Sequence, residues 1–223
     1  MIKVHKNFIT DDDISWLKND MEQRIQANQY EIKKFWSKDL INELYDIDWD
    51  VQEFRYEIQY MDPAMRIIKK LLKNILPQGV PFYAAYQRQF IPQTVHVDDM
   101  NNIVSPDFCY SGILPLDPNI NNIHKTIVWN LHFKTTNDMQ KYFETFDTRS
   151  INLSIINSDH YDLEHTLIGI YKPLDHLPLD GVYNYELGTL GLFDRAHVHC
   201  SSNWRKYNQC EYKDFIIFHF GTE

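Results

Sequence analysis

The sequence predicts an α+β protein in which helices come first and a β-sandwich or barrel follows. Two observations support this fold class. Long amphipathic helical segments lie in the first part of the 223-residue chain, whereas from about Pro81 onward short runs rich in aromatic and β-branched residues alternate with turn-forming clusters. Helices and strands that are segregated along a chain are typical of α+β domains.

Length and composition indicate one folded domain spanning residues 1–223. The chain is 43% hydrophobic, with only 7 Gly and 9 Pro, and so lacks the polar bias of disordered proteins. Its formal net charge of -9 provides no basic field for a phosphate backbone, which excludes general nucleic-acid binding. Neither a nucleic-acid nor a membrane partner is expected.

The cysteines and the hydropathy pattern predict a soluble, cytoplasmic protein. Three scattered cysteines form no CxxC pair and are too few for a disulfide framework, so reduced thiols are expected. The opening residues lack the apolar stretch of a signal peptide, and no run approaches the roughly 18 apolar residues of a membrane span.

Residues 1–80 are expected to form the helix-rich part of the domain. The alternating segment IKVHKNF predicts a strand, and Thr10 followed by three aspartates predicts a helix start, because a hydroxyl and early acids satisfy the amino end of a helix. The segment Ala64–Leu76 places its isoleucines and leucines on one stripe, which predicts a second amphipathic helix. Pro77-Gln78-Gly79 should end it.

Residues 81–223 are expected to form the β-rich core. The candidate strands are Phe82–Phe90, Thr94–Val97, Tyr110–Leu114, Thr126–Phe133, Leu167–Tyr171, Gly188–Phe193 and Phe215–Phe220. Between Thr135 and Pro178 the pattern is mixed, and NDMQKYFETF has the character of a short helix. An insertion or lid is therefore expected near residues 135–178.

The motif His96-Val97-Asp98 carries the strongest chemical signal in the sequence. Positions two apart on a strand project to the same face, so the imidazole and the carboxylate are expected to converge. Together with a second imidazole they would form the 2-His-1-carboxylate facial triad, which leaves open positions on iron(II).

The stretch LGLFDRAHVHCSSNW supplies two candidates for the second imidazole, His197 and His199. Alternation places both on one face of a strand, and only one is needed as a ligand. His132 and His219 lie in other predicted strands and are expected to be structural.

These motifs resemble those of the iron(II)- and 2-oxoglutarate-dependent dioxygenase superfamily, whose HxD…H triad is carried on a double-stranded β-helix of jelly-roll, cupin-like type. The resemblance implies an enzyme with Fe(II) as its metal and 2-oxoglutarate as cosubstrate, a hydroxylase that releases succinate and CO2. In this family the distal histidine commonly follows a Phe-containing strand after a short turn. LFDRAHVHCSS matches that arrangement best with His199 as the ligand, and His197 is the fallback.

The resemblance also implies which residues hold 2-oxoglutarate. The family places a basic residue at the start of the last core strand, where Lys213 in EYKDFIIFHF fits, with Arg205 and Lys206 as nearer alternatives. A cation there would pair with the far carboxylate of the cosubstrate. Tyr86 and Asn130 stand where relatives often place cosubstrate hydrogen-bonding groups.

Two other functions are compatible with the sequence. One is a cupin-like metalloprotein that uses the same ligands without 2-oxoglutarate, and Lys213 is the residue that discriminates it. The other is a non-catalytic jelly-roll binding or structural protein, which metal analysis would distinguish. The substrate, whether a small molecule or a protein side chain, is not identified by any motif, and neither is the oligomeric state.

Overall fold

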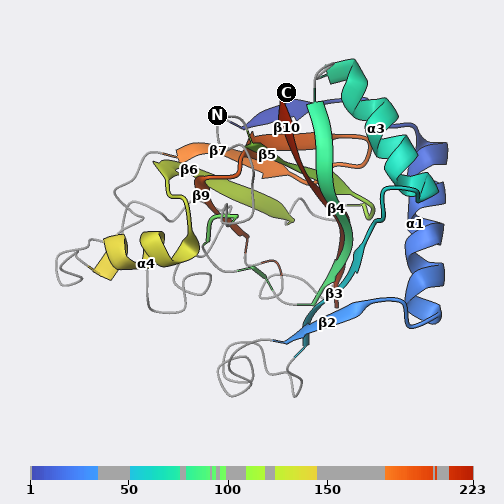
Figure 1. The fold of residues 1–223 in the computed structure, drawn as a ribbon, viewed down its shortest axis with the longest axis horizontal. Helices are drawn as coiled ribbons and strands as arrows, with labels where there is room; N and C mark the ends of the chain where they lie inside the picture. The colour runs from blue at the N-terminus through green and yellow to red at the C-terminus, as the bar shows by residue number, and fades with distance from the viewer. Residues whose placement is uncertain are drawn as a thin grey trace.

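The computed structural model describes residues 2–34, 51–75, 79–90, 92–93, 96–98, 109–118, 124–144, 179–202, 204 and 211–222. Two antiparallel sheets face one another, and two helices cover the outer face of the larger sheet (Figure 1). No helix among these residues is long and apolar enough to cross a membrane.

The larger sheet has seven strands in the order β1-β8-β5-β10-β4-β3-β2, and every pairing is antiparallel. Its strands are β1 (Lys3–His5), β2 (Glu31–Lys34), β3 (Val51–Glu57), β4 (Gly79–Gln89), β5 (Cys109–Pro115), β8 (Leu190–Asp194) and β10 (Lys213–Thr222). Strands that are distant in sequence are therefore neighbours, as a jelly roll requires.

The smaller sheet has the order β7-β6-β9, with β6 (Lys125–His132), β7 (Leu179–Asn184) and β9 (His197–Ser201). An isolated antiparallel bridge joins His96 to His199 and extends this sheet beyond β9. The segment that carries the His-Val-Asp motif is therefore held by the backbone against the segment that carries the distal histidine.

Helices α1 (Asp11–Gln26) and α3 (Pro63–Ile75) lie side by side against the larger sheet (Figure 1). Thr10 caps α1, since its hydroxyl accepts a hydrogen bond from the Asp13 amide at 3.2 Å. One apolar cluster joins the helices to the sheet, with Leu17 and Leu72 fully buried against strand residues such as Phe218. The helices therefore cover one face of the larger sheet, and its other face lies toward the smaller sheet.

The two faces of β10 show how the site is separated from this layer. Ile216 and Phe218 belong to the cluster under the helices, whereas Phe215 packs with Val128 and Tyr183 between the two sheets. Strand alternation therefore turns every second residue of β10 toward the space between the sheets.

Most of the expected elements are present, with differences in the amino-terminal part. The predicted strand, capped helix and second helix correspond to β1, α1 and α3, but residues 1–80 also contribute β2 and β3 to the larger sheet. Of the expected strand Thr94–Val97, His96 forms only an isolated bridge, and Thr94 and Val95 lie outside the described residues. A turn at Arg195-Ala196 makes β8 and β9 separate strands.

The expected insertion near 135–178 begins with a helix, α4 (Thr136–Glu144). The rest of that region, including the expected strand Leu167–Tyr171, lies outside the described residues.

Candidate metal centre

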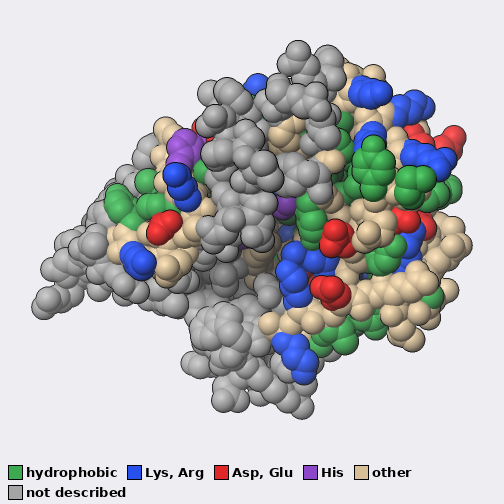
Figure 2. Space-filling model, viewed as in Figure 1, with side chains coloured by type: hydrophobic (Ala, Val, Ile, Leu, Met, Phe, Trp, Pro, Cys, Tyr) green, Lys and Arg blue, Asp and Glu red, His purple; other side chains and the backbone are tan. Residues whose placement is uncertain are grey.

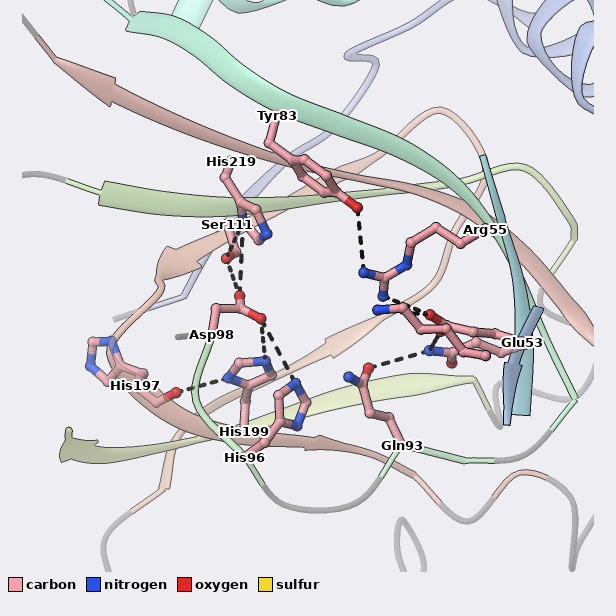
Figure 3. Close-up of polar contacts among 12 residues, drawn as sticks. Glu53, Arg55, Tyr83, Gln93, His96, Asp98, Ser111, His197, His199 and His219 are labelled. Carbon is pink, nitrogen blue, oxygen red and sulfur yellow. Dashed lines mark hydrogen bonds and ion pairs between the residues drawn. The ribbon is translucent and has the colours of Figure 1, made fainter. Parts of the chain in front are cut away.

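Three of the predicted ligands meet in the space between the sheets. Nε2 of His96 and Nε2 of His199 each lie 3.8 Å from Oδ1 of Asp98, and the ligand atoms of all three residues lie within 4.8 Å of one another (Figure 3). The backbones of His96 and His199 exchange two hydrogen bonds, at 3.0 and 2.9 Å. This bridge places the two imidazoles beside each other, with ring centroids 4.1 Å apart.

Hydrogen bonds around the triad orient the ligand atoms. Nδ1 of His199 lies 2.8 Å from the carbonyl oxygen of His197, and since a carbonyl only accepts, Nδ1 carries the proton and Nε2 keeps its lone pair. The Ser111 hydroxyl donates to Oδ2 of Asp98 and also lies 3.0 Å from Nδ1 of His219. Oδ1 of Asp98 is therefore left to face the two imidazoles.

The electrostatics of the pocket favour a carboxylate at position 98. Burial alone would raise the pKa of Asp98, but the imidazoles of His199, His219 and His96 and the Ser111 hydrogen bond hold that pKa well below its usual range. Burial lowers the pKa of His199 and lowers that of His219 to about 4, so both imidazoles are neutral near pH 7. Neutral imidazole and ionised carboxylate are the states that bind a metal.

The arrangement fits a six-coordinate divalent ion. Bonds of about 2.1 Å would set neighbouring ligand atoms about 3.0 Å apart at the corners of an octahedron, so each 3.8 Å separation needs less than 1 Å of closure. Two imidazole nitrogens and one carboxylate oxygen form the facial donor set of non-haem iron(II) sites. The remaining positions would be open to other ligands.

A second group of polar side chains lies one pleat along β9 from His199. Nζ of Lys213, which is 1% exposed, donates to Oγ of Ser201 at 3.1 Å, and it also lies 4.7 Å from the centre of the Tyr185 ring. The Tyr185 hydroxyl pairs with that of Thr126 at 3.0 Å. Burial lowers the pKa of Lys213 to about 7, although Glu53 and Cys200 act in the opposite direction. A buried ammonium with hydroxyls close to it suits a carboxylate.

Known structures identify this architecture. No protein-family model and no curated protein sequence matches the chain. The epimerase SnoN in complex with Fe3+, alpha ketoglutarate and nogalamycin RO superposes with a TM-score of 0.61 at 10% identity, over 99% of this chain and 78% of that one. The chain has the fold of the 2-oxoglutarate-dependent oxygenases, a double-stranded β-helix.

Two other solved structures show the same fold. HygX from Streptomyces hygroscopicus, with nickel and 2-oxoglutarate bound, has a TM-score of 0.55 at 8% identity, over 99% of this chain and 82% of that one. A Pseudomonas putida prolyl-4-hydroxylase has a TM-score of 0.51 at 8% identity, over 100% and 92% of the two chains. At such identities the likeness establishes the fold, and the activity must be argued from the site.

Two residues expected near the cosubstrate lie elsewhere in this double-stranded β-helix. The Tyr86 ring packs in the helix-facing cluster and its hydroxyl donates to Asp20 at 2.9 Å, because Tyr86 lies on the outer face of β4. Asn130 is exposed near the end of β6, after the register of that strand shifts. Arg205 and Lys206, the alternatives to Lys213, lie outside the described residues.

Ser111 and His219 also belong to the site, although neither was predicted to lie there. His219 was expected to be structural, yet it faces Asp98 at 3.9 Å and its ring stacks on Tyr83 with centroids 5.2 Å apart. Because alternate residues of a strand share a face, and His219 lies six residues after Lys213 on β10, the strand pattern would have placed both on the same inward face. For Ser111 the sequence carries no such signal, because its role depends on which strand lies beside Asp98.

A polar wall from β3 and β4 borders the triad and was also not predicted. Arg55 forms an ion pair with the buried Glu53 at 2.6 Å and donates to the Tyr83 hydroxyl at 3.4 Å (Figure 3). The side-chain amide of Gln89 donates to the side-chain oxygen of Gln93. The backbone carbonyl of Gln93 accepts from the Ser201 backbone amide at 3.1 Å. Figure 2 shows a histidine at the base of a recess on this side of the molecule, with Lys and Arg side chains beside its opening.

Proposed function

We propose that the protein is an Fe(II)- and 2-oxoglutarate-dependent oxygenase, in which His96, Asp98 and His199 hold the metal. The observation that carries this proposal is the convergence of the three ligand atoms, with Oδ1 of Asp98 3.8 Å from each imidazole, on the fold of this enzyme class. When bound, iron(II) would supply the redox chemistry that couples dioxygen and 2-oxoglutarate to oxidation of a substrate C–H bond.

The inward face of β10 favours 2-oxoglutarate as the cosubstrate. Going along this face from Lys213, the strand presents an ammonium, then Phe215 and Ile217, and then His219 beside Asp98. The ammonium donates to Ser201, which lies two residues, or about 7 Å, along β9 from the metal ligand His199, so a short dicarboxylate such as 2-oxoglutarate can reach both Lys213 and the metal. Lys213 with Ser201 is also the feature that favours this function over a cupin-like metalloprotein without 2-oxoglutarate.

The protein's own residues would prepare the site before dioxygen arrives. The carbonyl of His197 fixes the tautomer of His199, and Ser111 holds Asp98 with one oxygen toward the metal. The apolar packing of Phe193 against the His199 ring, at a centroid distance of 4.7 Å, excludes water from one side.

Hydroxylation, with release of succinate and CO2, is the proposed reaction. The type of oxidation depends on the position of the substrate relative to the metal. The structures similar to this chain include an alpha ketoglutarate dependent carbocyclase, SnoK, as well as an epimerase and a prolyl-4-hydroxylase. The polar wall of Glu53 and Arg55 beside the triad is the proposed substrate side, suited to a small molecule or a side chain with hydrogen-bonding groups.

The test is an anaerobic titration of the protein with iron(II) and 2-oxoglutarate, followed by exposure to air. A weak visible charge-transfer band should form under anaerobic conditions, and succinate should appear after air is admitted. Asp98→Ala should abolish both signals, whereas Asp12→Ala, which removes an exposed carboxylate from α1, should leave both intact. Absence of the band at saturating concentrations, or succinate formation by Asp98→Ala, would contradict the proposal.

A further inference from the structure

A second cluster of potential metal ligands lies beside the triad. His132, Asp194 and His197 each offer one ligand atom, and these atoms lie within 4.8 Å of one another. Over the described ranges of the chain, this is the only other group of its kind. The proposed oxygenase reaction uses none of these three side chains.

The ends of three strands bring the cluster together. His132 is the last residue of β6 and pairs with His197, the first residue of β9, after a shift in register. Asp194 ends β8, and the short turn that follows leads directly to His197. The rings of His132 and His197 cross at 72° with centroids 3.9 Å apart, and their Nε2 atoms lie 2.6 Å from each other.

The two histidines of β9 face different clusters of ligand atoms. Nε2 of His199 faces Asp98, whereas Nε2 of His197 faces His132. Figure 3 shows the His197 ring turned away from the rings of His96 and His199. His197 is therefore not an alternative third ligand of the triad, and its imidazole belongs to the second cluster.

The donor set of this cluster suits a transition metal ion. The two Nε2 atoms lie 2.6 Å apart, so one of them donates its proton to the other, and Asp194 and the nearby Asp180, 3.8 Å from Nε2 of His197, place carboxylates around them. A tetrahedral ion with bonds of about 2.0 Å needs nitrogens about 3.3 Å apart. His132 is exposed at the strand end, so its ring has room to move outward by less than 1 Å.

We propose that His132, Asp194 and His197 bind a second divalent ion of the Zn2+ type, with water as the fourth ligand. Two imidazoles and a carboxylate are ligands that zinc prefers, and the ion would replace the proton between the two Nε2 atoms. Such an ion ties together the ends of β6, β8 and β9. Because the carbonyl of His197 accepts from His199 Nδ1, the ion also stiffens the backbone that orients a ligand of the triad.

The test counts zinc on the full-length protein. Metal-free protein is incubated with excess Zn2+, desalted, and analysed by mass spectrometry for bound metal per chain. Wild type should retain two equivalents, one in each site, and Asp98→Ala should retain one. His132→Ala and Asp194→Asn should each lose one equivalent. Asparagine keeps an oxygen that accepts from the Ala196 amide, an interaction that Asp194 makes at 2.8 Å, so the turn is preserved.

His5→Ala is the matched control, since it removes an imidazole from β1 without touching either cluster, and it should retain two equivalents. Zinc should also raise the Tm of Asp98→Ala, and this rise should be lost when His132→Ala is added. The second site would be overturned if wild type retained one equivalent of zinc and Asp98→Ala retained none. It would also be overturned if His132→Ala and Asp194→Asn both retained as much zinc as wild type. Equal stoichiometry in Asp98→Ala and wild type, with a loss in His132→Ala, would support the second site and contradict the proposed function.

Discussion

Replacing Lys213 with methionine is predicted to stabilise the protein and to impair its proposed cosubstrate site. The pKa of Lys213 falls from the ordinary 10.5 to about 7 because the ammonium is buried. Each pH unit corresponds to about 1.4 kcal/mol, so the lysine at this position costs the folded state roughly 4 kcal/mol at pH 7. Methionine carries no charge, and the lost hydrogen bond to Ser201 offsets only about 1 kcal/mol.

Lys213→Met should therefore raise the free energy of unfolding by about 3 kcal/mol in the absence of 2-oxoglutarate, or the Tm by roughly 6–12 °C. Binding of 2-oxoglutarate should change in the opposite direction. A buried carboxylate left without its cation loses about 3–5 kcal/mol, which corresponds to a 10²–10⁴-fold increase in Kd. Thermal melts by circular dichroism and anaerobic calorimetry with iron(II) measure the two effects on the same preparation.

The pH dependence provides a second measurement on wild type. Between pH 7 and about 10 the unfolded chain binds a proton at Lys213 that the folded chain does not, so stability should rise with pH over that range. Affinity for 2-oxoglutarate should fall over the same range, because only the protonated lysine pairs with the carboxylate. Lys213→Met should lose both dependences. A destabilised Lys213→Met variant that binds 2-oxoglutarate like wild type would refute this reasoning and make Lys213 a structural residue.

Three further predictions follow from single contacts. Ser111→Ala removes the donor to Asp98 and should weaken iron(II) binding about 10–100-fold in competition with a chelating dye; unchanged affinity would remove Ser111 from the site. Thr10→Ala should lower the free energy of unfolding by about 1 kcal/mol in urea, since it deletes the cap of α1, while Thr135→Ser, which keeps the hydroxyl that caps α4, should have little effect. Leu72→Ala should cost about 2–5 kcal/mol through the cavity left under α3, and a cost below 1 kcal/mol would show that this layer does not hold the sheet.

The sequence by itself predicted much of the fold and the ligand triad of the proposed metal site. Local signals were sufficient for the helices, because the Thr10 cap and the apolar stripe of α3 act within a few residues. The HxD motif was also a local signal, since a spacing of two on an extended segment brings His96 and Asp98 together whatever the rest of the chain does.

The tertiary structure decided which face of each strand lies at the site. Both faces of β4 are buried, one under the helices and one between the sheets, so no alternation of apolar and polar residues marks the inner face. Tyr86 was predicted to lie near the cosubstrate but belongs to the outer face, and Gln87 and Gln89 are the inward residues. Alternation can tell which residues share a face, but only packing tells where that face points.

The partners that complete each site also depend on tertiary structure, because they come from distant strands. Register between β6 and β9 sets His132 against His197, 65 residues apart, and so separates His197 from His199. The position of β5 sets Ser111 against Asp98. The sequence determined which side chains could bind a metal, whereas strand order and register decided how those side chains divide between two clusters.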